Sequence, residues 1–404
     1  MSDGFSLTEV GWSQPVRRIA RGKAVSQHEA LARRAQAARD NPEEAKQAYD
    51  GARRSLLGEF AGQPVADCQP CMASRKAESR RQRRELIDKA IVSCPSCATE
   101  AVRLRQDMDE VENMRCARHV YTANDPDAPP ELRDNPPPGF LKPTEEDYAE
   151  MGITPDMLQP KGTSFRAGLY MKDPAVWAPP DPPDPKGIVA FRGSTPAMED
   201  WENNMMQGIN SDPGFVPDGQ TTPNEPYYRR AVEIGAAARK SGGSLQFVGH
   251  SLGGGLASAA QGGSGGANGL PTSTYNSAGL NSATVAKFAE NGAAADPAMI
   301  RAIRLKGEVL TKTQETGMAS YVAPKAVGIK RDLEPVHDKA YYLAHEGAFD
   351  RAAAAKAGAS FDENESYSTY LHGMDEVIAS MEAQKEADQK KLDACVNRKR
   401  PAAG

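Results

Sequence analysis

The sequence lacks several features that would assign it directly to a class of protein. Its 404 residues contain no internal repeat and no apolar run of about 18 residues, the length that a membrane-spanning helix needs. The formal net charge is −5, so the composition gives no indication of an obligatory nucleic-acid partner. Histidine is scarce, with six in the chain, so a site that requires one has few candidates.

The first residues also lack the uninterrupted apolar segment of a secretory signal peptide; they are MSDGFSLTEVGWSQPVRRIARGKA. We therefore expect synthesis in the cytoplasm without Sec-type export. If the protein acts outside the cytoplasm, we expect other machinery to carry it there.

Composition divides the chain into four parts. Residues 1–122 are rich in Ala, Glu, Arg and Gln and predict a helical region that ends in an antiparallel hairpin, with its turn at 93–97. Residues 123–160 are dense in proline, which is typical of a linker. Residues 161–395 alternate short apolar runs with helical segments, the pattern of a mainly parallel α/β sheet. Residues 396–404 form a basic tail.

One motif predicts a catalytic nucleophile. The segment QFVGHSLGGGLASAA contains G-x-S-x-G centred on Ser251, between a predicted buried strand and a predicted helix. In this motif the serine lies on a strained turn that only small neighbours permit, and the helix N-terminus offers N–H groups to an oxyanion. His250 precedes the serine, and we expect its side chain to point away from the site. A structural glycine-rich turn is the alternative.

A serine nucleophile also needs a histidine base and an acid that orients it. In α/β-hydrolases the acid and then the histidine follow the serine. The segment YLHGMDEVIASM places His372 in a short loop before a helix, so we predict it as the base, with His337 as second choice. Glu308 follows the predicted strand in AIRLKGEVL and is the predicted acid, with Asp332 as its alternative.

Five segments together point to a known family. In chain order they are VAFRGSTPAMEDWENN, VGHSLGGGLAS, TYNSAGL, IRLKGEVLTKTQE and LHGMDEVI. Over roughly residues 140 to 395 they resemble the class 3 (fungal-type) lipases, and most of all the bacterial branch found among type VI secretion effectors. The resemblance implies an α/β-hydrolase sheet, preceded here by the N-terminal helical hairpin region, and a serine esterase that needs no cofactor.

The resemblance also implies roles for single residues. Ser251 would be the nucleophile and His372 the base, while Glu308 stands where the family usually has aspartate. The residue after FRG, Ser194, would supply one oxyanion donor, and the N–H of Leu252 would supply the other.

The family places its lid directly after the FRGS strand. In this chain that segment contains three large apolar residues that would form the lid's lipid-facing side: Trp201, Met205 and Met206. Packing of the same side chains in the core is the alternative.

The implied reaction is hydrolysis of phospholipid acyl esters through an acyl-enzyme, of the phospholipase A type. The implied role is that of an antibacterial effector, delivered by a contact-dependent secretion apparatus into a target cell's periplasm. Its partners would be a phospholipid membrane, a component of that apparatus and a cognate immunity protein, with no nucleic acid. The alternatives are a general esterase or neutral-lipid lipase, and a catalytically inert adaptor of a secretion system.

The six cysteines allow several arrangements. Two C-x2-C pairs, at 68–71 and 94–97, have the spacing of zinc ligands. The 22 residues between the pairs contain no Gly or Pro and predict one helix, which at about 1.5 Å per residue is too long for one metal to bind both pairs. The hairpin would instead bring together four candidate zinc ligands: Cys68, Cys71, Cys116 and His119. Disulfides and free thiols are the alternatives.

The run RKAESRRQRREL, residues 75–86, carries six basic side chains. They are interleaved with Glu78 and Glu85 on a predicted helix. This pattern favours a solvated face or a partner-docking surface over a nucleic-acid patch.

Overall fold

The computed structural model describes residues 69–126, 128–178, 183–194, 227–289, 293–315, 324–356 and 360–397. These residues build a seven-stranded sheet flanked by helices, which agrees with the predicted α/β class. The strands are β1 (Phe140–Leu141), β2 (Ala167–Lys172), β3 (Gly187–Phe191), β4 (Leu245–His250), β5 (Thr272–Tyr275), β6 (Ile300–Leu305) and β7 (Ile329–Leu333).

The helices lie before, between and after these strands. The longer ones are α3 (Gln69–Ser93), α4 (Ala98–Thr122), α10 (Tyr227–Ser241), α11 (Leu252–Gly263), α15 (Glu346–Lys356), α16 (Glu363–Tyr370) and α17 (Met374–Val396). The shorter ones are η2 (Pro95–Cys97), α5 (Pro130–Arg133), α6 (Glu145–Met151), α7 (Pro155–Leu158), α8 (Pro174–Trp177), η3 (Gly266–Asn268), α12 (Ser282–Phe288), η5 (Pro297–Met299), α13 (Val309–Glu315) and α14 (Lys339–Ala344).

The sheet follows the chain order from β1 to β7. Strands β3 to β7 are parallel, and β1 and β2 extend one edge in antiparallel pairing. Parallel neighbours need crossover connections, which α10, α11, α12 and α13 supply. The parallel strands all point the same way, so their carboxyl ends lie along one side of the sheet. The loops that follow β4, β5 and β6 therefore lie together on that side.

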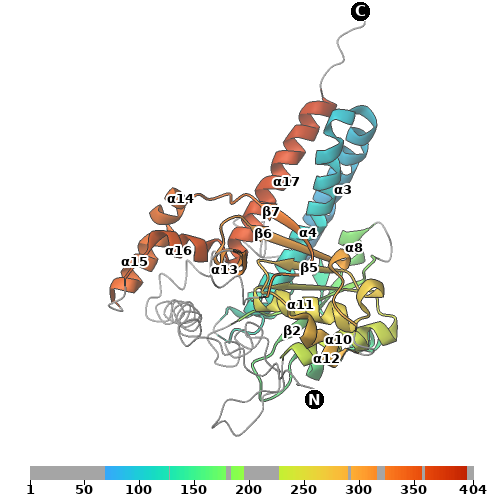
Figure 1. Cartoon of the computed structure of the whole chain (residues 1–404). Coiled ribbons are helices and arrows are strands. Elements are labelled where there is room, and N and C mark those ends of the chain that lie inside the picture. The colour runs from blue at the N-terminus through green and yellow to red at the C-terminus, as the bar shows by residue number, and fades with distance from the viewer. Residues whose placement is uncertain are drawn as a thin grey trace, which may run out of the picture.

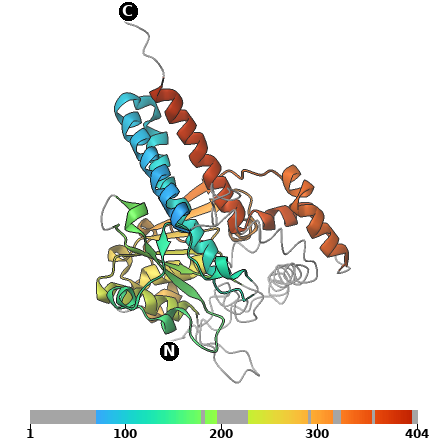
Figure 2. The same ribbon diagram turned by 180° about the vertical axis from the view of Figure 1, so that it is seen from behind.

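Alternate residues of the central strands pack into two separate cores. Val189 and Phe191 of β3 belong to the core beneath α10 and α11. Their neighbours Ile188 and Ala190 belong to the core beneath α4 and α17, on the opposite face. Figure 1 shows α10 and α11 in front of the sheet, and Figure 2 shows α4 crossing the other face. The N-terminal hairpin therefore forms one layer of the α/β body together with the C-terminal helix.

The domain boundaries predicted at 122 and 161 need correction on this point. Val111 and Met114 of α4 share a core with Val248 of β4, so the predicted boundary at residue 122 does not divide two cores. The predicted linker, residues 123–160, contains α5, α6, α7 and the edge strand β1. Two of its prolines, Pro130 and Pro155, are the first residues of short helices, where a missing N–H does no harm, so they do not mark a linker.

Beyond the sheet, α3, α4 and α17 continue as a three-helix bundle (Figure 1), which we call the stalk. Its core consists of Ile87, Ala90, Ala101, Leu104, Met108 and Leu392. A disulfide joins Cys94, in the α3–α4 turn, to Cys395 near the end of α17, with 6.2 Å between their Cα atoms. The disulfide thus links the turn of the N-terminal hairpin to the last turn of α17.

Among the described helices, none combines the length and the apolar character that crossing a membrane requires.

Candidate active site

Ser251 lies in the sharp turn between β4 and α11. Its backbone has φ 58° and ψ −127°, a conformation that non-glycine residues rarely adopt. The glycines of the motif are required by packing: a Cβ on Gly249 would collide with the carbonyl oxygen of Gly253, and a Cβ on Gly253 with that of Phe191. The turn presents the serine at the edge of the sheet where the parallel strands end.

The three residues predicted as nucleophile, base and acid lie in one hydrogen-bonded line. Nε2 of His372 is 3.0 Å from Oγ of Ser251, and Nδ1 is 2.7 Å from Oε2 of Glu308. Glu308 follows β6, and His372 lies in the loop between α16 and α17. Residues separated by more than a hundred positions thus meet at one edge of the sheet.

Glu308 is completely buried and held by several donors. Its carboxylate accepts hydrogen bonds from the N–H groups of Leu310, at 2.8 Å, and Thr311. Burial alone would raise the pKa of Glu308, but the hydrogen bond and charge of His372, together with these N–H groups, hold the pKa below its ordinary value. An ionised carboxylate only accepts, so Nδ1 of His372 carries the proton and Nε2 offers its lone pair to the serine hydroxyl.

The two predicted oxyanion donors belong to segments next to Ser251. Leu252 is the first residue of α11, and a first-turn N–H has no acceptor within its own helix. Ser194 lies in the loop after β3, next to Gly193. A Cβ on Gly193 would lie 3.2 Å from Cβ of Ser251, so this loop runs directly beside the nucleophile. The donor roles remain predictions.

The predicted lid residues, Trp201, Met205 and Met206, lie outside the described residues. Their role as a lipid-facing surface therefore stays a prediction.

The second-choice residues lie elsewhere and have other partners. Nδ1 of His337 is 2.7 Å from Glu376 and 3.2 Å from the hydroxyl of Tyr370. Asp332 forms an ion pair with Arg304. The structure thus joins Ser251 with the first-choice base and acid.

Three residues around the site were not found from the sequence. His250 was expected to point away from the site, yet its Nε2 lies 2.7 Å from the carbonyl oxygen of His372. Asn276, directly after β5, also contacts this carbonyl. Tyr121, near the end of α4, contacts Nδ1 of His250. A polar residue at the carboxyl end of a parallel strand was the one available signal, and it applied to Asn276.

Of the candidate Cys3His zinc ligands, Cys68 lies outside the described residues, and Cys71 and His119 have other partners. Cys71 is disulfide-bonded. Both ring nitrogens of His119 are engaged, Nδ1 with the Tyr170 hydroxyl at 2.9 Å and Nε2 with the Leu132 carbonyl at 2.8 Å. Burial lowers the pKa of His119 to about 4, so its ring is neutral and structural. The disulfide alternative is realised at Cys94, with Cys395 as its partner.

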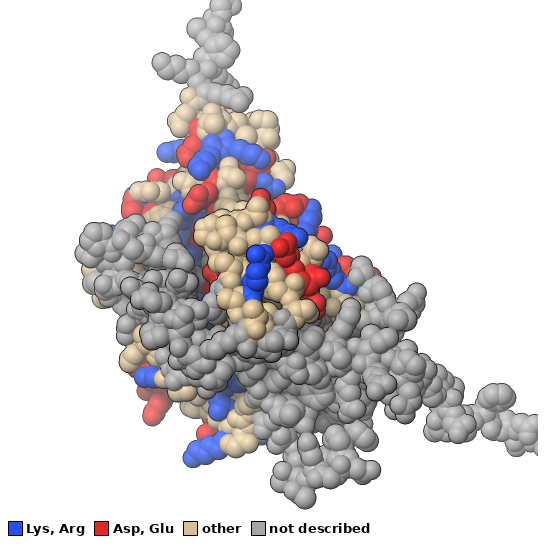
Figure 3. All heavy atoms as spheres, turned by 90° about the vertical axis from the view of Figure 1, so that its left-hand side faces the viewer, with Lys and Arg blue, Asp and Glu red and all other residues tan. Residues whose placement is uncertain are grey.

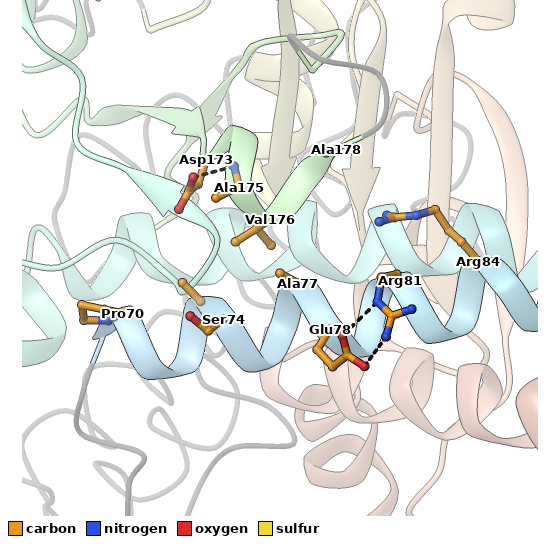
Figure 4. A pocket seen from close by; sticks show the side chains of 11 residues that line it. Pro70, Ser74, Ala77, Glu78, Arg81, Arg84, Asp173, Ala175, Val176 and Ala178 are labelled. Carbon is orange, nitrogen blue, oxygen red and sulfur yellow. Dashed lines mark hydrogen bonds and ion pairs between the residues drawn. The ribbon is translucent and has the colours of Figure 1, made fainter.

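The basic run of α3 is largely engaged within the protein. Lys76 pairs with Glu112 in the interior, and the guanidinium of Arg80 lies 4.2 Å from the centre of the Trp177 ring. Arg81 pairs with Glu78 along a groove of about 580 Å³ between α3 and α8 (Figure 4). Since α8 follows the antiparallel strand β2, this groove lies at the sheet edge opposite Ser251.

Seen from the side of α14, α15 and α16, the described surface carries acidic and basic residues intermixed (Figure 3). Arg351 and Glu363 form one of its ion pairs. Neither sign of charge dominates this face.

Comparison with known proteins links this geometry to lipid chemistry. A family model described as a Tle-like phospholipase domain matches residues 112–341, which include Ser251 and Glu308 but end before His372. The extracellular phospholipase A1 of Serratia liquefaciens is 28% identical over 252 residues, which are 61% of this chain. The aligned part spans 65% of that relative's length.

Proposed function

The chain belongs to the family of Tle-like phospholipase domains, and on that premise we propose that it is an enzyme that hydrolyses acyl esters of membrane phospholipids. The observation that carries the proposal is the hydrogen-bonded line from Ser251 through His372 to Glu308. The likeness to a phospholipase A1 supports an A-type reaction, in which a fatty acid leaves the glycerol backbone.

The reaction proceeds in two steps through an acyl-enzyme. Nε2 of His372 takes the Ser251 proton as Oγ attacks the ester carbonyl carbon. The N–H groups of Leu252 and Ser194 hold the resulting oxyanion. The imidazolium then gives its proton to the departing lysophospholipid alcohol, and the ester C–O bond breaks.

Water completes the cycle. His372 removes a proton from a water molecule, which attacks the acyl-enzyme and releases the fatty acid, and Ser251 regains its proton. Glu308 stays ionised throughout. It keeps the imidazole in the required tautomer and stabilises the imidazolium that forms in each step.

The biological role that we propose is that of an antibacterial effector, of the class 3 lipase type, neutralised in the producer by a cognate immunity protein. Support comes from the five sequence segments that resemble type VI secretion effectors. The Cys94–Cys395 disulfide also fits a protein that works in an oxidising compartment such as a target cell's periplasm.

The direct test is fatty-acid release from vesicles of phosphatidylethanolamine and phosphatidylglycerol. Wild type should release fatty acid, and Ser251→Ala should lower the rate by several orders of magnitude. Ser258→Ala is a matched control, because Ser258 lies in α11, the helix that follows Ser251, and within the described part of the chain its hydroxyl donates to the Gly254 carbonyl at 2.9 Å. Cleavage of a short soluble ester without phospholipid cleavage would favour the general esterase.

The effector role has its own test. Wild type directed to the periplasm of a test bacterium should stop growth, whereas cytoplasmic wild type and periplasmic Ser251→Ala should not. Equal growth arrest by periplasmic wild type and Ser251→Ala would favour the inert adaptor instead.

A further inference from the structure

Asn276 has a backbone conformation that is rare for a non-glycine residue, and both polar atoms of its side chain are hydrogen-bonded. It is completely buried directly after β5, with a positive φ of 41°. Its Nδ2 donates to the carbonyl oxygens of Leu371, at 3.0 Å, and His372, at 3.1 Å. Its Oδ1 accepts from the N–H of Leu305 at 2.9 Å. One amide therefore joins the loop of the base to the strand end that leads to Glu308.

His250 holds the same carbonyl from the other side. Its Nε2 lies 2.7 Å from the carbonyl oxygen of His372, and its Nδ1 lies 3.0 Å from the hydroxyl of Tyr121. A carbonyl only accepts, so Nε2 carries the proton and Nδ1 accepts from Tyr121. Burial, reinforced by the neighbouring His372, lowers the pKa of His250 to about 3, which keeps the ring neutral and this pattern fixed.

Tyr121, in the last turn of α4, connects this helix to His250. A Cβ on Gly193 would collide with the Tyr121 hydroxyl, so this hydroxyl packs against the loop that leads to Ser194 as well as against His250. The last turn of the N-terminal hairpin thus touches both the support of the base and the loop beside the nucleophile.

We infer that Asn276 and His250 are positioning residues that fix the main chain of His372, and that Tyr121 fixes His250 in turn. The inference rests on the proposed function. The His372 ring must point Nδ1 at Glu308 and Nε2 at Ser251 simultaneously, and its loop has no strand to hold it. Two donors on one carbonyl supply that constraint, and a displacement of about 1 Å in such a site lowers a rate by about 100-fold.

The test uses paired variants and a short soluble ester. Asn276→Gly keeps the positive φ accessible but removes the amide, and His250→Ala removes the second donor. Each should lower kcat by about 10- to 100-fold with little change in KM. His250→Gln, whose amide can donate to the same carbonyl, should recover most of the loss. Tyr121→Phe should give a smaller loss of the same kind.

A second readout does not depend on activity. The Nδ1 proton of His372, shared with Glu308, should give a low-field proton NMR signal in wild type that Glu308→Gln abolishes. Asn276→Gly and His250→Ala should broaden or shift it under conditions in which circular dichroism shows both variants to be folded. An unchanged signal and unchanged kcat in folded variants would overturn the inference. A wild-type protein with the signal but no esterase activity would instead contradict the proposed function.

A separate observation concerns the tip of the stalk. The Sγ atoms of Cys94, Cys97 and Cys395 all lie within 4.8 Å of one another. Cys94 and Cys97 have the C-x2-C spacing of zinc ligands, and Cys97 is the N-cap residue of α4. The Ser96 hydroxyl lies 3.6 Å from Sγ of Cys94 and 3.8 Å from Sγ of Cys395.

We propose that the reduced chain binds Zn²⁺ through these three thiolates. The stalk core, including Ala90 and Leu392, holds the three segments together with or without the disulfide, so reduction leaves three sulfurs converging on one point. Tetrahedral zinc with bonds of about 2.3 Å separates its sulfur ligands by about 3.8 Å. The sulfurs of Cys94 and Cys395 must therefore move apart after reduction, and the 6.2 Å between their Cα atoms leaves room for this. The disulfide and the zinc ion would then be alternative cross-links between the hairpin and α17.

Titration of the reduced full chain with Co²⁺ tests this site. Wild type should develop the intense near-ultraviolet band of thiolate-bound cobalt, which Zn²⁺ should abolish, and Zn²⁺ should raise the melting temperature. Cys97→Ser and Cys395→Ser should lose the band, whereas Cys71→Ser, which disables the other C-x2-C pair, should keep it. Absence of the band in wild type, or its loss only in Cys71→Ser, would overturn the proposal.

Discussion

The carboxylate of Glu308 lies 2.7 Å from Nδ1 of His372, although this chain has glutamate where the lipases that it resembles usually have aspartate. The extra methylene is accommodated because the carboxylate is turned back onto the first N–H groups of α13, those of Leu310 and Thr311. The carboxylate of Glu308 is therefore held by the first turn of α13 as well as by His372.

Substitutions of Glu308 should test its role as the acid that orients His372. Glu308→Gln removes the charge that stabilises the imidazolium and should lower kcat by about 100- to 10,000-fold. Glu308→Asp keeps the charge but falls one methylene short of His372, so its kcat should lie between those of wild type and Glu308→Gln. Steady-state kinetics on a soluble ester measure both. Equal activity of Glu308→Gln and wild type would exclude Glu308 as the acid.

A buried ionic cluster among α3, α4 and α17 predicts a second outcome. Glu112 accepts from Lys76 and Arg115, and all three side chains are almost wholly buried. Glu112→Gln leaves two buried cations short of a counter-charge, so it should lower the free energy of unfolding by about 3–5 kcal/mol at neutral pH. Denaturant titration measures the loss. Glu78→Gln breaks an exposed pair with Arg81 and should have no measurable effect.

The same cluster predicts how stability changes with pH. Burial alone would raise the pKa of Glu382, but Arg115 and Lys385 outweigh it and lower the pKa to about 2. A depressed carboxyl pKa adds stability above the unfolded-state pKa, about 4.5, and that stability is lost as the pH falls toward 2. The melting temperature of wild type should therefore fall over this window, and less steeply in Glu382→Gln. Parallel curves for the two proteins would contradict the assignment.

The disulfide of the stalk should contribute to the free energy of unfolding but not to the catalytic rate. Cys395→Ser opens a link between positions 301 residues apart and should cost about 2–5 kcal/mol of unfolding free energy. The bond lies at the far end of the 23-residue helix α17, about 35 Å from the His372 end, so kcat per folded molecule should not change. Cys97→Ser leaves the disulfide intact and should match wild type under oxidising conditions.

The sequence was most informative where chemistry and local geometry coincide. Ser251 has its own signature, because its strained turn requires glycines on both sides. Glu308 and His372 were located by their order in the chain and by their positions after a strand and before a helix. Their hydrogen bonds could not be predicted from the sequence, because contacts between residues 64 and 121 positions apart depend on the order of the strands in the sheet.

The packing of α4 on the sheet and the contacts that hold the His372 loop were not predictable from local sequence patterns. The periodicity of α4 indicates a buried face, but it does not indicate that this face lies against β3 and β4. The prolines of residues 123–160 were interpreted as a linker because composition does not reveal which of them begin a helix. Asn276 and Tyr121 act through partners far away in the chain, and no local rule links them to His372.

The central claim is that Ser251 is a nucleophile activated by His372. The most direct measurement is the site and rate of covalent labelling by a long-chain fluorophosphonate, followed by peptide mass spectrometry of the intact chain's digest. Ser251 should be modified in wild type, Ser258 should stay unmodified, and labelling should be slower by orders of magnitude in His372→Ala. Labelling of another residue, or an unchanged rate in His372→Ala, would contradict this claim.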